Sequence, residues 1–156
     1  HEQGSGGNLP EGEVFTSPAV VEGVFVTRVL GDYFSGKYGL LSDPVRIEIA
    51  DGRVKQVSSP LKEIAAELEG YLDSAENGRR VGEFAIGTNR AVKSLCGSML
   101  QDEKIPGVHI AFGDPLGHST GADWTSAVHV DVVNPGCSIE VDGELLMQDG
   151  RFLLPS

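Results

Sequence analysis

The 156-residue chain carries 23 acidic and 12 basic residues, which gives a formal net charge of −11. A surface this acidic argues against nucleic acid or an anionic membrane as a partner, and no apolar run in the sequence approaches the roughly 20 residues that span a bilayer. At this length we expect a single domain, 1–156, with a substantial core. Two cysteines are too few for a disulfide framework, so we expect a reduced, cytoplasmic setting.

The first part of the chain predicts two strands and a hairpin. We expect strands over 13–16 and 20–30, followed by a glycine-rich loop over 31–44. Residues on both sides of Asp51-Gly52 alternate between apolar and polar, and this dipeptide is the strongest short-range signal for a hairpin. The segment therefore predicts two antiparallel strands that meet at this turn.

The rest of the chain adds helices and further turns. Apolar residues at helical spacing predict a helix over about 60–75, with Ser59 as its cap, and a second, shorter helix is expected over 91–100. Two more Asp-Gly turns, at 142–143 and 149–150, indicate antiparallel pairing near the end of the chain. We therefore expect an α+β fold with a mostly antiparallel, curled or barrel-like β-sheet and two or three helices.

Two predicted strands each place a histidine away from their apolar face. In a strand, residues two apart share a face, so His129 and Asp131 stand together opposite the valines that alternate with them. His109 lies in the same way within the run 108–113. A single strand histidine is more often a hydrogen-bonded structural residue than a ligand. Two histidines and an aspartate with matching strand phase favour a metal site.

Two glutamates lie beside apolar neighbours. Glu13 follows a glycine turn into an apolar strand, and Glu83 lies between Gly82 and the apolar run 84–86. An ionised carboxylate in such surroundings requires a partner, and a metal cation would serve. A surface position or an ion pair, for Glu83 with Arg79 or Arg80, is the other interpretation.

Four sequence blocks occur in a fixed order: 8–16, 82–89, 102–113 and 129–131. Together they resemble the C-terminal part of the thermophilic aminopeptidases, the metallopeptidases of the aminopeptidase T and aminopeptidase S type. The resemblance covers nearly the whole chain. Because those proteins are much longer and this chain begins with His1, we expect it to be the C-terminal part of a longer protein.

The resemblance implies a metal-dependent aminopeptidase that releases N-terminal amino acids from peptides or related small molecules, and a homodimer. Glu83 would be the ligand that bridges two divalent metal ions, and the ligand set suits zinc or cobalt. The implied metal ligands are Glu13, Glu83, His109, His129 and Asp131.

One departure from the family concerns catalysis. The family carries a catalytic tyrosine shortly after the first-histidine strand, where this chain has Leu116, and no tyrosine follows Tyr71. His118 lies close by in sequence and could act as an acid or base near neutral pH. Glu83 and His118 are therefore the candidate catalytic residues, and a solvated loop histidine is the other reading of His118.

Two alternative functions remain open at this stage. Relatives of the same fold resemble hydroxypyridine ring-cleaving dioxygenases, in which one iron ion is bound by two histidines and one carboxylate; His109, His129 and Asp131 form that type of triad. The chain could also be a non-catalytic binding or dimerisation module that keeps only the fold.

Overall fold

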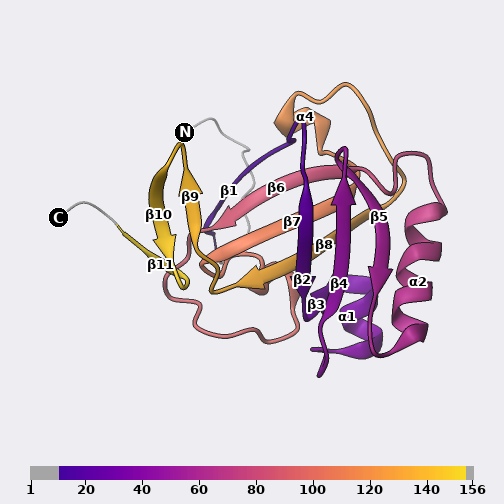
Figure 1. Cartoon of the computed structure of the whole chain (residues 1–156), viewed down its shortest axis with the longest axis horizontal. Coiled ribbons are helices and arrows are strands. Elements are labelled where there is room, and N and C mark those ends of the chain that lie inside the picture. Colours follow the sequence, from indigo (N-terminus) through magenta and orange to yellow (C-terminus); the bar gives the residue numbers. More distant parts are fainter. Residues whose placement is uncertain (1–10, 154–156) are drawn as a thin grey trace, which may run out of the picture.

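The computed structural model describes residues 11–153 as three antiparallel sheets and four helices (Figure 1). The central sheet has five strands in the order β1-β6-β7-β8-β3. These strands are β1 (Glu13–Thr16), β6 (Val81–Gly87), β7 (Gly107–Gly113), β8 (His129–Pro135) and β3 (Val29–Leu30).

The strands of a second sheet run across those of the central sheet in Figure 1. They lie in the order β2-β4-β5. It contains β2 (Gly23–Thr27), β4 (Val45–Ala50) and β5 (Arg53–Ser58). The predicted hairpin at Asp51-Gly52 is confirmed, and both turn residues have positive φ, 53° and 64°, as a two-residue turn between twisted strands requires. Helix α2 (Lys62–Asp73) packs on β5 and buries four apolar residues at helical spacing, Ile64, Ala65, Leu68 and Leu72.

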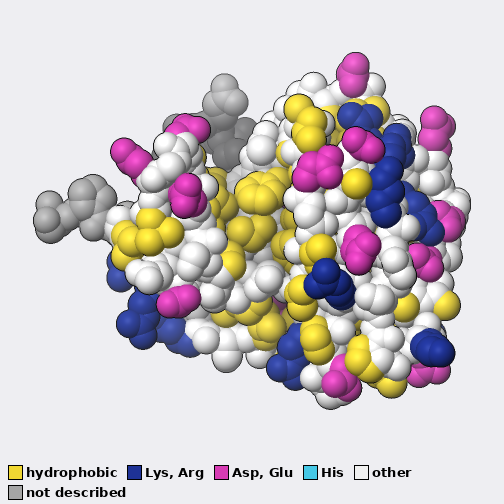
Figure 2. Space-filling view, viewed as in Figure 1, with side chains coloured by type: hydrophobic (Ala, Val, Ile, Leu, Met, Phe, Trp, Pro, Cys, Tyr) yellow, Lys and Arg dark blue, Asp and Glu magenta, His cyan; other side chains and the backbone are white. Residues whose placement is uncertain are grey.

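The third sheet forms a separate edge of the molecule near the end of the described chain (Figure 1). Its strands are β9 (Ile139–Val141), β10 (Glu144–Gln148) and β11 (Arg151–Phe152). The two expected Asp-Gly turns join them, and Asp142 and Asp149 have φ values of 52° and 47°. Hydrophobic side chains gather in the hollow between this sheet and the rest of the molecule in Figure 2.

The central sheet has two unlike faces. Val130 and Val132 of β8 and Ile110 of β7 belong to the main core, together with buried residues of β4 and α2. The other face carries the alternating positions, and there a smaller apolar cluster forms around Val133, with Val29, Met99 and Ile105. The polar side chains of the site share this second face with that cluster.

The α+β, antiparallel fold is confirmed, although the sheets between residues 11 and 153 do not close into a barrel. The prediction of a loop over 31–44 was wrong in part, because helix α1 (Asp32–Tyr38) forms there and buries Phe34. The helix expected over 91–100 was also wrong: only α3 (Met99–Asp102) forms at its end. Together with α4 (Gly117–Thr120), these short helices raise the number above the expected two or three.

Ser59 does not cap α2 as predicted. The helix begins at Lys62 with Leu61 at the capping position, and the Ser59 hydroxyl instead accepts a hydrogen bond from the Leu61 amide at 3.2 Å. The predicted strand over 20–30 is divided into β2 and β3. None of the helices between residues 11 and 153 has the length and apolar character needed to cross a lipid bilayer.

Candidate metal centre

The register of β6, β7 and β8 places four of the predicted ligands on one face of the central sheet, and Glu13 of β1 lies opposite Gly87 of β6. Ala111 of β7 lies opposite both Glu83 of β6 and Asp131 of β8, so only a methyl side chain separates the two carboxylates in that row. His109 and His129 lie in the neighbouring rows, opposite Ala85 and Gly113 respectively. Small residues between the polar ones leave room for the side chains to converge.

A first group of donors contains Glu13, Glu103 and His109, whose ligand atoms lie within 4.8 Å of one another. The Nε2 atom of His109 lies 3.4 Å from Glu13 Oε2 and 3.4 Å from Glu83 Oε1. His109 is 1% exposed, and its Nδ1 is the buried side-chain atom that lacks a hydrogen-bond partner among the described residues. His109 therefore presents Nε2 to carboxylates from two different strands.

A second group contains Glu83, His129 and Asp131, again with ligand atoms within 4.8 Å of one another. The Nε2 atom of His129 lies 3.5 Å from Asp131 Oδ1. On the other side of the ring, Nδ1 lies 2.9 Å from the carbonyl oxygen of Asp114, which can only accept, so Nδ1 donates. This hydrogen bond fixes the ring and leaves Nε2 as the ligand atom in the neutral form, as is usual for metal-binding histidines.

The chemistry of the donors fits divalent cations. Zn²⁺ binds imidazole nitrogen and carboxylate oxygen at about 2.0–2.2 Å, which places the ligands of one ion about 3–4 Å apart. The distances around His109 and His129 are in that range. Because Glu83 contacts His109 and also belongs to the second group, it lies between the two groups, where the predicted bridging ligand would lie.

The same proximity changes the pKa of both imidazoles. Burial opposes protonation of His129, but the Asp131 carboxylate outweighs it and raises the pKa of His129 to about 9. Burial also acts to lower the pKa of His109, while Glu83, Asp131 and Glu13 raise it above its ordinary value. Each ring is thus held in a field of negative charge that favours a cation, either a proton or a metal ion.

Glu103 and Lys104 are parts of the site that the sequence did not predict. Lys104 is 1% exposed, and its Nζ lies 2.6 Å from Glu13 Oε1 and 2.5 Å from Glu103 Oε1. Burial raises the pKa of Glu103 although Lys104 opposes this shift. Burial acts to lower the pKa of Lys104, but Glu103 and Glu13 hold it above its ordinary value. The only signal in the sequence was the charged run 102–104 within one of the resembling blocks.

His118 is not brought to either group of donors. It lies exposed on α4, which follows the left-handed Leu116 at φ 52°. The alternative ion pairs of Glu83 are not formed: Arg79 pairs with Asp73, and the Arg80 guanidinium lies over the Trp124 ring at 4.0 Å. The five predicted metal ligands come together, and the proposed catalytic role of His118 stays a prediction.

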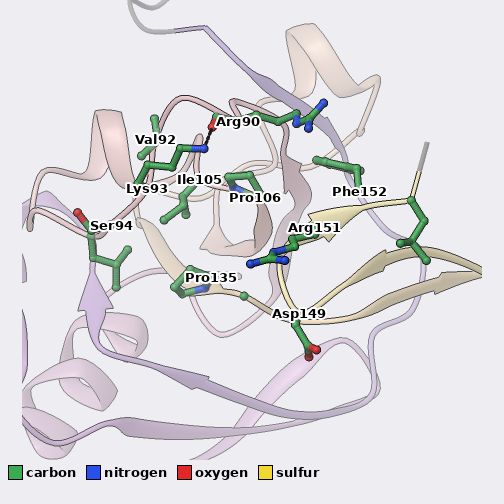
Figure 3. A pocket seen from close by; sticks show the side chains of 14 residues that line it. Arg90, Val92, Lys93, Ser94, Ile105, Pro106, Pro135, Asp149, Arg151 and Phe152 are labelled. Atoms are coloured by element: carbon green, nitrogen blue, oxygen red, sulfur yellow. Dashed lines mark hydrogen bonds between the residues drawn. The ribbon is translucent and has the colours of Figure 1, made fainter. Parts of the chain in front are cut away.

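A cavity of about 800 Å³ lies beside the segment that carries Lys104 (Figure 3). Ile105, Pro106 and Pro135 line it on one side, and Arg151 and Phe152 of β11 on the other. Lys93 also lines it, but its Nζ donates to the carbonyl oxygen of Arg90 at 2.5 Å. None of the predicted metal ligands lines this cavity, so it is separate from the two donor groups.

Two solved structures share the fold of this chain. The solved structure of wild-type AmpT from Thermus thermophilus is 24% identical and superposes with a TM-score of 0.67, covering 94% of this chain and 40% of its own. That of 2,5-dihydroxypyridine dioxygenase from Pseudomonas putida is 15% identical, with a TM-score of 0.68, covering 90% of this chain and 43% of its own.

The chain thus spans less than half the length of either solved protein, and at these identities the likeness concerns the fold. A comparison with curated proteins gives no match. The sequence matches the family described as thermophilic metalloprotease (M29) over residues 2–152, almost its entire length. With the family matched over that span and the fold shared with AmpT, this chain belongs to the thermophilic metalloprotease (M29) family.

Proposed function

We propose that this chain forms the metal-binding part of an aminopeptidase-like hydrolase that releases N-terminal amino acids from peptides at a site for two divalent cations. The observation that carries the proposal is the division of six donors into two groups of three, joined through Glu83. Zinc and cobalt suit these donors. Membership of a metalloprotease family supports the hydrolytic assignment.

Each of the two cations would be held by three of the donors. Glu13, Glu103 and His109 would hold one cation, and Glu83, His129 and Asp131 the other. Bound divalent ions of this type polarise a scissile carbonyl and lower the pKa of a coordinated water. The protein itself supplies the carboxylates that would offset the charge of the two cations, and the Asp114 carbonyl holds the His129 ring in orientation.

Metal content provides the direct test. After loading with Zn(II) or Co(II) and desalting, we expect about two ions per chain in the native protein, measured by mass spectrometry of the metals. Glu83→Gln should lower this content, since it weakens the link between the groups. Glu140→Gln, an exposed glutamate on β9, and His118→Ala, an exposed histidine, are the matched controls and should keep the native content.

Activity is tested on aminoacyl reporter substrates with a free amino group and on the same substrates after N-acetylation. The proposal predicts metal-dependent hydrolysis of the free forms only. A native protein that retains no divalent ion contradicts the proposal and leaves the non-catalytic module as the better interpretation.

The fold shared with 2,5-dihydroxypyridine dioxygenase favours one alternative, a single iron ion on His109, His129 and Asp131. The geometry gives this alternative less support, because His109 belongs to a different donor group from the other two residues. One iron ion per chain together with oxygen uptake in the presence of a dihydroxypyridine would favour the dioxygenase over the hydrolase.

A further inference from the structure

Lys104 is a fully buried ammonium group between two of the candidate ligands. Its side chain is 1% exposed, and Nζ contacts Oε1 of Glu13 at 2.6 Å and Oε1 of Glu103 at 2.5 Å. A lysine is almost never buried to this extent unless its charge is paired. Both of its partners come from the first donor group, and both are only slightly exposed themselves.

The backbone holds Lys104 in this position. The Asn89 amide donates to the Lys104 carbonyl at 2.9 Å, next to the end of β6. Gly87 allows the approach, because a Cβ at that residue would lie 1.9 Å from the carbonyl oxygen of Ile105. The backbone of Lys104 is therefore held against the end of β6, and this fixes where its side chain starts.

The contacts also orient a carboxylate. Lys104 takes the Oε1 atom of Glu13, and the remaining Oε2 faces His109 Nε2 at 3.4 Å. One oxygen of Glu13 is thus held by the lysine while the other points to the imidazole of the same group. Without a cation, the two carboxylates Glu13 and Glu103 would repel each other within a weakly solvated site.

We propose that Lys104 is a positioning residue, a built-in counter-cation that keeps Glu13 and Glu103 assembled beside His109 before a divalent ion binds. This inference rests on the proposed function, since it takes the cluster to be a metal site. A lysine that only packs in the structure would matter equally with and without metal. A bound metal ion should offset part of the carboxylate charge in place of Lys104, so the loss of stability on removing Lys104 should be greatest in the metal-free protein.

The test compares Lys104→Met with native protein, each in metal-free form and after saturation with Zn(II), by thermal unfolding. We expect the variant to lower the Tm of the metal-free protein by about 10 °C, because breaking a buried ion pair leaves charge uncompensated. In the Zn(II)-saturated protein the loss should be about half of this or less. Lys93→Met, which removes an exposed lysine from the same segment between β6 and β7, should change neither Tm.

An equal loss of Tm with and without Zn(II) would overturn the inference, because a purely structural lysine would behave in that way. Glu103→Gln supplies a second readout. In the double variant with Lys104→Met, the metal-free protein should recover part of the lost Tm, because one of the two repelling charges is gone. If Lys104→Met gives no soluble metal-free protein, Lys104→Gln replaces it, since its amide still donates to one carboxylate.

The two proposals fail in different ways. If the native protein binds no Zn(II), the proposed function is wrong. The Tm values of the two single variants and the double variant, all metal-free, then still test whether Lys104 offsets the charges of Glu13 and Glu103. If the effects of Lys104→Met and Glu103→Gln on Tm are additive, the inference about Lys104 is overturned. If Zn(II) binds but the loss of Tm does not depend on it, the function stands and the inference about Lys104 falls.

Discussion

At the scale of single residues, Gly87 controls how closely the turn with Glu103 and Ile105, in the segment between β6 and β7, approaches the sheet. A Cβ there would lie 1.9 Å from the Ile105 carbonyl oxygen and 2.9 Å from that of Glu103. We expect Gly87→Ala to push this segment away, to cost about 2 kcal/mol of stability as overpacking does, and to weaken Zn(II) binding. Denaturant unfolding and metal titration measure the two effects.

Gly70 provides the matched control for this substitution. It lies within α2, and a Cβ at this position meets nothing within 4 Å. Gly70→Ala should therefore stabilise the protein by about 0.5–1 kcal/mol through helix propensity and leave Zn(II) binding unchanged. Equal loss of stability in both variants would contradict the close-approach argument.

The sequence predicted those site residues that strand periodicity controls. His109, His129 and Asp131 follow a period of two, so their common face could be read from the neighbouring valines. Glu103 and Lys104 reach the site on a turn after α3, where no period fixes the direction of a side chain. Their positions depend on a tertiary contact at Gly87, which a single sequence does not reveal.

At the scale of elements, α1 and α2 are linked by a polar cluster around Glu67. Its carboxylate accepts hydrogen bonds from Tyr33 at 2.9 Å, from Lys37 at 2.8 Å and from Tyr38. These contacts, with the buried Phe34, explain why a helix forms where glycines predicted a loop. The hydrogen bonds from Lys37 and Tyr38 lower the pKa of Glu67 from 4.5 to about 2.

This lowered pKa predicts how the link depends on pH. Because the pKa is lower in the folded protein, Glu67 stabilises it fully above about pH 4.5, and the contribution is lost as the pH falls toward 2. The Tm difference between native protein and Glu67→Gln should therefore shrink across that interval. A difference that stays constant from pH 6 to pH 2.5 would show that the carboxylate charge has no part in the link.

Asp102 determines the course of the segment where a longer helix was expected. It is 0% exposed, and its carboxylate accepts the amides of Cys96 and Gly97, each at 2.8 Å. These bonds fix the segment as a turn with Gly97 at φ 82°, so helix formation starts only at Met99. The helical pattern in the sequence was overridden by a buried side chain that binds the backbone.

We expect Asp102→Ala to cost about 2–3 kcal/mol, because two backbone amides lose a buried, charged acceptor. Asp102→Asn should cost less, since its carbonyl oxygen still accepts one of them. Chemical denaturation compares the two variants. Equal and small losses in both would mean that the turn is held by the neighbouring apolar cluster alone.

At the scale of the whole molecule, the central sheet has the residues that pack in the main core on one face and the candidate metal ligands on the other. Its strands bury valine and isoleucine against the main core on one face and carry carboxylates and imidazoles on the other. This arrangement follows from strand alternation, and it is why the fold class could be predicted although the lengths of individual helices could not. Neighbouring residues of β8 therefore contribute alternately to the stability of the core and to the candidate metal site.

Val130 and Asp131 allow a direct test of this separation, because they are adjacent in β8 and point to opposite faces. Val130→Ala should lower the stability by about 2–3 kcal/mol through lost packing, and yet keep the native Zn(II) content in the folded protein. Asp131→Asn should mainly affect the metal: it preserves the side-chain shape and removes a charge, so Zn(II) is lost from the second group, whereas the metal-free protein loses only the pairing of Asp131 with His129. Unfolding curves and metal content, measured on the same samples, decide the outcome. If both substitutions reduce stability and metal content in parallel, the two faces are coupled, and metal binding depends on the core rather than on the local donors.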